Sequence, residues 1–248
     1  MYARIFTYSF LLFVFLACKK ENALDCFKSN GKEITEVRSP GSFTKIELND
    51  KIELNISYGP EFKVEVIAGK HVIKNIRTEV ADGILKIEDL NKCNFVRGYK
   101  RIHKVNVTMP YLSSVLNNSV TKIEIREGFE QDSVRVRAES SGDIHLAGTY
   151  GFIKAHSNGN GDVYLKGKCK SLNVYINGTN FLRAEELSIS DYVFIQTLTK
   201  GDCFFNTANL ARFEYIIYSE GNIYYKGQPL EITGFQEKGA KGKMIRED

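Results

Sequence analysis

Short stretches in which apolar and polar residues alternate cover much of the chain, which is typical of strands with one buried face and one wet face. In the first half, between residues 43 and 110, they include residues 45–48, 51–56, 62–68 and 104–109. We therefore predict a short-stranded, partly antiparallel β module at 43–110. Only residues 71–77 have the character of a helical turn.

Two pairs of turn residues separate strands of this module. Asn49-Asp50 lies between 45–48 and 51–56, and we predict a hairpin there. Asp82-Gly83 is the stronger hairpin signal, because a type I′ turn needs positive φ at both central residues.

The second half of the chain repeats one phrase: a small residue, then Asp or Asn, then an apolar residue. Successive acid or amide positions are 19, 18, 22 and 20 residues apart. These positions are Asp143, Asp162, Asn180, Asp202 and Asn222. The apolar residues that follow them are Ile144, Val163, Phe181, Cys203 and Ile223, which we expect to fill one interior column.

A second alternating strand precedes each turn and keeps its phase from repeat to repeat, as in Val134/Val136 and Ile153/Ala155. One repeat of two short strands cannot bury its apolar face alone, whereas stacked coils form a continuous core. We therefore predict a β-solenoid at 111–235, in which Gly and Asp close each corner. The alternative is an antiparallel sandwich with regular hairpins.

Large side chains recur at the outward position of each repeat, two residues after the Asp or Asn. This predicted stripe contains His145, Tyr164, Leu182, Phe204 and Tyr224, and Phe194 and Ile216 extend it on the other strand. An exposed apolar stripe usually marks an interface. Three partners fit it: the N-terminal β module, a second copy of the protein, or sugar rings of an extracellular ligand.

The N-terminus has the features of a targeting segment. Arg4 precedes a mainly apolar stretch at 6–16, which is shorter than the roughly 20 residues that span a bilayer. This stretch ends in Ala17-Cys18, and a small residue followed by Cys resembles a bacterial lipobox. We predict a lipoprotein signal peptide at 1–17 and acylation of Cys18, with an ordinary cleaved signal peptide as the alternative. The neighbouring Lys19 favours the outer membrane.

Composition and local context predict the remaining segments of the chain and the state of the other cysteines. Residues 18–42 read as anchor and linker, and 236–248 as a polar tail. Cys26 and Cys93 stand in polar, loop-like contexts, where an exported protein can form a disulfide. Cys203 stands at an apolar repeat position and is predicted to be a small core residue.

Charge and reactive groups narrow the function. The net charge of +4 comes from 34 basic and 30 acidic residues that are interspersed, so we predict no nucleic-acid partner. No cysteine spacing suits zinc, and the repeated Asp residues are better turn caps than calcium ligands. His145 and His156 are predicted on the surface of adjacent coils, close enough to approach each other. We predict no catalytic residue, no metal and no cofactor.

Several of these features together resemble the head GIN domain family, autotransporter-adhesin heads that occur in lipoproteins of diderm bacteria. They are the strand at 43–46, the hairpin at 80–87, the strand at 105–110 and the Gly-Asp phrases after Ser141 and Asn160. The resemblance runs from about residue 43 to 227 and implies a right-handed β-solenoid-like fold with an adhesive or binding role. Thr179-Asn180 departs from the expected Gly-Asp.

These inferences predict a non-catalytic, lipid-anchored binding or adhesion protein of the cell envelope. Its expected partners are the membrane, through acylated Cys18, and a glycan or an extracellular protein. The first alternative is a structural envelope protein that forms homo-oligomers. The second alternative is an enzyme acting on polysaccharide.

Overall fold

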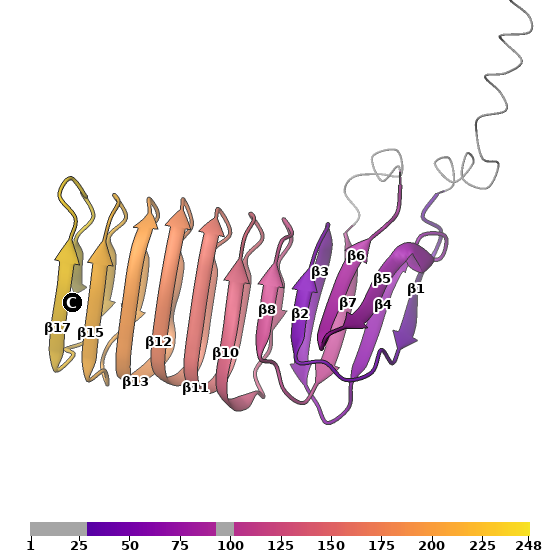
Figure 1. The fold of residues 1–248 in the computed structure, drawn as a ribbon, viewed down its shortest axis with the longest axis horizontal. Coiled ribbons are helices and arrows are strands. Elements are labelled where there is room, and N and C mark those ends of the chain that lie inside the picture. Colours follow the sequence, from indigo (N-terminus) through magenta and orange to yellow (C-terminus); the bar gives the residue numbers. More distant parts are fainter. Residues whose placement is uncertain (1–28, 93–101) are drawn as a thin grey trace, which may run out of the picture.

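The computed structural model describes residues 29–92 and 102–248, which form one elongated β structure (Figure 1). Cys18, Cys26 and Cys93 lie outside the described residues. The predicted all-β fold, with a solenoid in the C-terminal half and a partly antiparallel module before it, is confirmed. Within the described ranges, no helix is long and apolar enough to cross a membrane.

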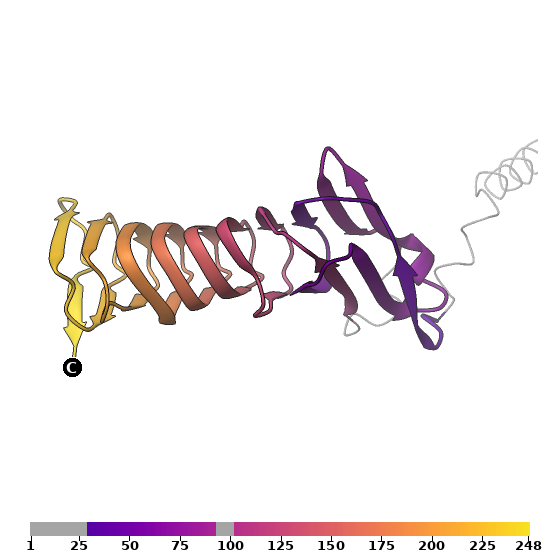
Figure 2. The ribbon, with the colours of Figure 1, turned by 90° about the horizontal axis from the view of Figure 1, so that it is seen from below.

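The N-terminal module is stacked on one end of the solenoid (Figures 1 and 2). Its strands are β1 (Glu33–Arg38), β2 (Lys45–Leu48), β3 (Ile52–Tyr58), β4 (Lys63–Gly69), β5 (Ile76–Ala81), β6 (Ile84–Asp89) and β7 (His103–Met109). The expected helical turn is the 3-10 helix η2 (Ile73–Asn75). The pairs β1–β4, β4–β7 and β5–β6 are antiparallel.

The hairpin predicted at Asp82-Gly83 is confirmed, since β5 and β6 pair across it with φ of 52° and 72° at these two residues. The hairpin predicted at Asn49-Asp50 is wrong. Strand β2 pairs in parallel with β6 and β8, and β3 pairs in parallel with β7 and β9, so Asn49-Asp50 is a corner between two walls. Asp50 has φ of 63°, which a corner needs as much as a hairpin does.

The solenoid continues the coils that β2 and β3 begin. Its strands are β8 (Ser114–Asn117), β9 (Ile123–Ile125), β10 (Glu130–Ala138), β11 (Ile144–Gly159), β12 (Val163–Gly178), β13 (Leu182–Thr199), β14 (Cys203–Asn206), β15 (Arg212–Ile217), β16 (Ile223–Lys226), β17 (Glu231–Gln236) and β18 (Met244–Glu247). All solenoid pairs are parallel. Strand β18 lies inside the predicted polar tail and pairs with β16.

One interior column runs through six coils and is at most 1% exposed at every position. It consists of Ile123, Ile144, Val163, Leu182, Cys203 and Ile223. Leu182 therefore occupies the place that we predicted for Phe181. The reason is that Asn180, which is fully buried, stands where the other repeats have the corner glycine, so the third repeat begins one residue later than we predicted.

The corner carboxylates, which we predicted to cap their own turns, accept hydrogen bonds from the backbone of the next coil. Asp143 accepts a hydrogen bond from the backbone N–H of Asp162 at 2.9 Å, and Asp162 accepts one from the N–H of Phe181 at 2.8 Å. Asp202 accepts in the same way from the N–H of Asn222, and the amide oxygen of Asn222 accepts from the N–H of Lys243. Phe181 occupies the Asp position of the third repeat, and its side chain has no oxygen to accept a hydrogen bond from the next coil.

Candidate binding groove

Parallel register places one outward side chain per coil in a row. The row, which we call the outer row, contains His145, Tyr164, Arg183, Phe204 and Tyr224. Arg183 replaces the predicted Leu182, because the shift of the third repeat turns Leu182 inward. All five side chains are half-buried.

The rings of the outer row stack on one another along the solenoid axis. His145 lies 4.2 Å from Tyr164 with 17° between the ring planes, and Phe204 lies 5.1 Å from Tyr224 with 11°. The guanidinium of Arg183 lies 4.1 Å above the ring of Phe204. Much of each ring face is therefore used within the protein, and the ring edges face outward. This geometry disfavours the sugar stacking on ring faces that we considered from the sequence.

The N-terminal module does not cover the outer row. It lies on the end of the solenoid (Figure 2), where Asn55 of β3 is in register with Glu124, and Glu124 is in register with His145. The module thus extends the same wall. The first of the three predicted partners is excluded for the described residues.

Phe194 and Ile216 do not join the outer row. Phe194 lies between Asn173 and Glu214 on the other wall, and Ile216 is in register with Gln196. His156 also belongs to that wall, where it is in register with Tyr175. His145 and His156 therefore do not approach each other, contrary to the sequence prediction.

A groove of about 630 Å³ lies beside the outer row. Its lining includes three outer-row residues, the small Ala147, two further cations and four carboxylates; these are His145, Tyr164, Arg183, Ala147, Arg126, Lys166, Glu124, Glu127, Glu185 and Glu186. The register between β12 and β13 shifts after the pair Tyr164–Arg183, so that Lys166 faces Glu186. This bulge adds one residue to the third coil and lets Glu185 and Glu186 both reach the groove.

Five charged side chains of the groove form ion pairs that are open to water. The amine of Lys166 lies 3.4 Å from Glu127 and 3.7 Å from Glu186, and these three side chains are 56%, 71% and 73% exposed. Arg183 lies 3.5 Å from Glu185. Exposed pairs of this kind contribute little to stability. Their donors and acceptors can therefore exchange to an incoming polar ligand at low cost.

The two rings at the groove are uncharged at neutral pH. Burial, assisted by nearby Lys122, lowers the pKa of His145, so its imidazole offers one donor and one acceptor. Burial and the carboxylates of Asp162 and Asp143 raise the pKa of Tyr164, so its phenol keeps its proton. That hydroxyl lies 3.4 Å from the Asp162 carboxylate.

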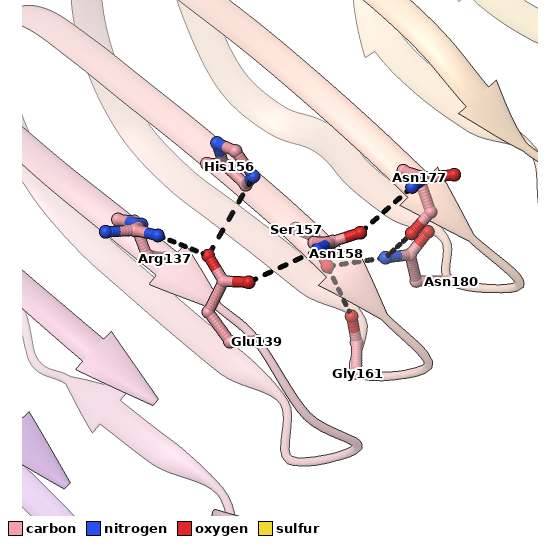
Figure 3. A network of polar contacts seen from close by, with 8 residues as sticks. All are labelled: Arg137, Glu139, His156, Ser157, Asn158, Gly161, Asn177 and Asn180. Carbon is pink, nitrogen blue, oxygen red and sulfur yellow. Dashed lines mark hydrogen bonds and ion pairs between the residues drawn. The ribbon is translucent and has the colours of Figure 1, made fainter. Parts of the chain in front are cut away.

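The opposite wall carries a polar network near the corners (Figure 3). Glu139 contacts Arg137 and lies 3.9 Å from His156, and it accepts a hydrogen bond from Asn158. Asn177 donates to Asn158 at 2.9 Å. These side chains bond along the axis and hold neighbouring coils in register, which is a structural role.

Comparison with known proteins identifies the family. The model of the family described as "Putative auto-transporter adhesin, head GIN domain" matches residues 42–229. The chain belongs to this family. The resemblance inferred from the hairpin and the Gly-Asp phrases is thereby confirmed. No curated protein matches the sequence.

Solved structures share the fold of this head GIN domain chain. It is similar to a "putative adhesin" from Bacteroides fragilis NCTC 9343, with 20% identity, a TM-score of 0.79, and coverage of 87% of this chain and 97% of that one. A "putative adhesin" and a "Putative lipid binding protein", both from Parabacteroides distasonis ATCC 8503, give TM-scores of 0.59 and 0.60. Their identities are 16% and 15%, and they cover 87% and 88% of this chain and 98% of their own.

Two cysteines lie in the described part of this head GIN domain chain. Cys169 and Cys203 are both free and buried, and burial raises the pKa of each thiol to about 12. Cys203 is a core residue, as predicted. Among the residues described, no group of three or more His, Cys, Asp or Glu side chains is placed to hold a metal ion.

The sequence reasoning missed most of the groove. Arg183, Lys166, Glu127 and Glu186 were not among the predicted site residues. Arg183 would have been found by aligning the buried Asn180 with the corner glycines. The position of Glu186 depends on the bulge in β13, for which the alternation of residues gives no signal.

Proposed function

We propose that this protein is an exported, lipid-anchored, non-catalytic adhesion protein of the cell envelope, facing outward or into the periplasm from the outer membrane. The observation that carries the proposal is the open groove beside the outer row. The adhesin family supports export to the cell envelope, and the lipobox-like Cys18 supports lipid anchoring there. The groove lies on a wall of stacked parallel strands.

We further propose that the groove binds a neutral, hydroxyl-rich carbohydrate. Lys166 and Arg183 already have carboxylate partners, so a strongly charged ligand would leave one member of each pair unbalanced. Sugar hydroxyls accept from the cations and donate to the carboxylates without changing the net charge. Such ligands are held by hydrogen bonds to charged groups, each worth about 1.5–3 kcal/mol.

Binding rather than catalysis fits the carboxylates of the groove. A general acid in a glycoside hydrolase needs a raised pKa, which comes from burial or from a like charge. Glu127 and Glu186 are instead 71% and 73% exposed, and both contact Lys166. Neither carboxylate is buried, and each already forms an ion pair with the amine of Lys166, an arrangement suited to holding polar ligand groups.

We expect the double substitution of Lys166→Ala and Arg183→Ala to weaken glycan binding at least tenfold, about 1.4 kcal/mol or more. The matched control is Arg137→Ala with Lys154→Ala, which removes the same charges from the opposite wall. The measurement is a glycan array, followed by titration of each glycan that binds. Equal binding by both double variants would place the ligand elsewhere.

The anchor has its own test. We expect Cys18→Ser to move the full chain from the membrane fraction to the soluble fraction, because acyl chains on this residue supply the membrane affinity. Fractionation of cells followed by immunoblotting measures the change. Full retention of the variant in the membrane fraction would contradict the anchor.

A further inference from the structure

The C-terminal end of the solenoid exposes two strand edges. Strands β17 and β18 form the last coil (Figures 1 and 2), and among the described residues each pairs with one strand only, β15 and β16 respectively. All six residues of β17 are exposed. Each outer edge therefore carries backbone N–H and C=O groups that no described strand satisfies.

The interior is also open at this end. On the other wall, Ile232 is in register with the inward-facing Phe213 of the preceding coil. Ile232 is nevertheless 39% exposed, whereas Phe213 is fully buried. Phe235 and Leu230 in the same coil are 54% and 88% exposed. The last coil therefore presents apolar side chains together with unpaired strand edges.

The edge of β17 lacks the usual protection against pairing. Natural edge strands carry Lys, Pro or inward charges that prevent another strand from adding. Strand β17, Glu231–Gln236, contains one charged residue and neither Lys nor Pro. By contrast, β1 at the other end has three charged residues among six, Glu33, Glu36 and Arg38.

We propose that the C-terminal coil is the self-association surface of this protein, where two copies join tail to tail. The unpaired backbone groups of β17 and β18 lie on two different walls. A single added strand would pair with the edge on one wall and leave the edge on the other wall unpaired. A second copy presents the same cross-section and the same two edges. Antiparallel pairing of β17 with its copy sets Glu231 away from the other Glu231, so like charges do not meet.

Such a pair points the two N-terminal modules in opposite directions, since β1 lies at the far end of the molecule from β17 (Figure 2). The link to membranes rests on the proposed anchor: with both copies on outer membranes, the pair joins the membranes of two cells and requires the outward-facing orientation. The self-association itself does not depend on the glycan groove, and failure of one proposal leaves the other intact.

The test is sedimentation velocity of the full chain in density-matched detergent. We expect a dimer that dissociates on dilution, and at least a tenfold higher Kd for Phe235→Lys. The control Val120→Lys alters a side chain that is 59% exposed away from this end, and we expect it to dimerise like the unsubstituted chain. A monomer at every concentration, or a normal Kd for Phe235→Lys, overturns the proposal.

Disulfide cross-linking tests the orientation. Thr233 lies near the middle of β17, so antiparallel pairing brings its two copies together, and we expect Thr233→Cys to form covalent dimers above the background of the unsubstituted chain. Thr35→Cys in β1 should form none. Cross-links that need a mixture of the Thr233→Cys and Thr35→Cys proteins would show head-to-tail assembly and overturn the tail-to-tail pair.

Discussion

Gly178→Ala is expected to lower the free energy of unfolding by about 3–5 kcal/mol, which is more than most single substitutions cost. Gly178 has φ of 116°, a conformation that L side chains rarely adopt. A Cβ at this position would lie 2.0 Å from the carbonyl oxygen of Gly159 in the preceding coil. The strain of the dihedral alone costs about 1–3 kcal/mol, and the clash adds to it.

The clash cannot be relieved by a small shift. Gly159 and Gly178 are in register at the ends of β11 and β12, and the parallel ladder between these strands fixes their spacing at roughly 4.8 Å. Moving the corner outward would break several hydrogen bonds on both walls. Glycine at position 178 is therefore required by the stacking of its coil on the preceding one and not only by its own dihedral angle.

Urea unfolding of the full chain followed by circular dichroism measures this effect. Gly83→Ala is the matched control, because Gly83 also has positive φ, at 72°, but has no atom within 4 Å of the new Cβ. We expect it to cost about 1–2 kcal/mol. A Gly178→Ala protein as stable as the Gly83→Ala protein would mean that neighbouring corners are not in close contact.

Local patterns were enough to predict the solenoid. Ile144, Val163, Cys203 and Ile223 each follow a Gly-Asp or Gly-Asn pair, and all four lie in one interior column. In a parallel stack each coil repeats the environment of the last, so the same local pattern recurs at the same place. This is why a repeat architecture can be inferred from sequence more readily than a fold built from distant pairings.

The alternation of apolar and polar residues alone could not separate a hairpin from a corner. Asp50 and Asp82 both have positive φ and both connect two short alternating strands. Asp82-Gly83 joins strands that pair with each other, whereas Asn49-Asp50 joins strands that pair with other coils. The turn residues carry part of the difference, because the hairpin has positive φ at both Asp82 and Gly83 whereas the corner has it at Asp50 and not at Asn49.

The groove could not be predicted from the sequence for a related reason. It needs side chains from neighbouring coils, and their alignment depends on which residue of the third repeat takes the corner position and on the bulge between Arg183 and Glu186. Asn180 at the glycine position hides the true start of the repeat, and the bulge moves the later side chains of the strand by one residue relative to the neighbouring coil. Regular spacing, which made the solenoid predictable, hides these irregular positions.

The third repeat offers a direct test of its register. We expect Leu182→Ala to cost about 2–5 kcal/mol, because Leu182 is fully buried in the interior column and its loss leaves a cavity. Phe181→Asn should change stability by about 1 kcal/mol or less. Phe181 is half-buried, and an Asn there supplies the acceptor that the other corners use toward the next coil.

Comparing the two variants by urea unfolding separates the two registers. If Phe181 filled the interior column instead, its replacement by Asn would be the costly change and Leu182→Ala the mild one. The expected order also bears on the groove, because the inward position of Leu182 is what turns Arg183 outward beside Phe204. A reversed order would remove Arg183 from the outer row, and with it one of the two cations to which we assign ligand binding.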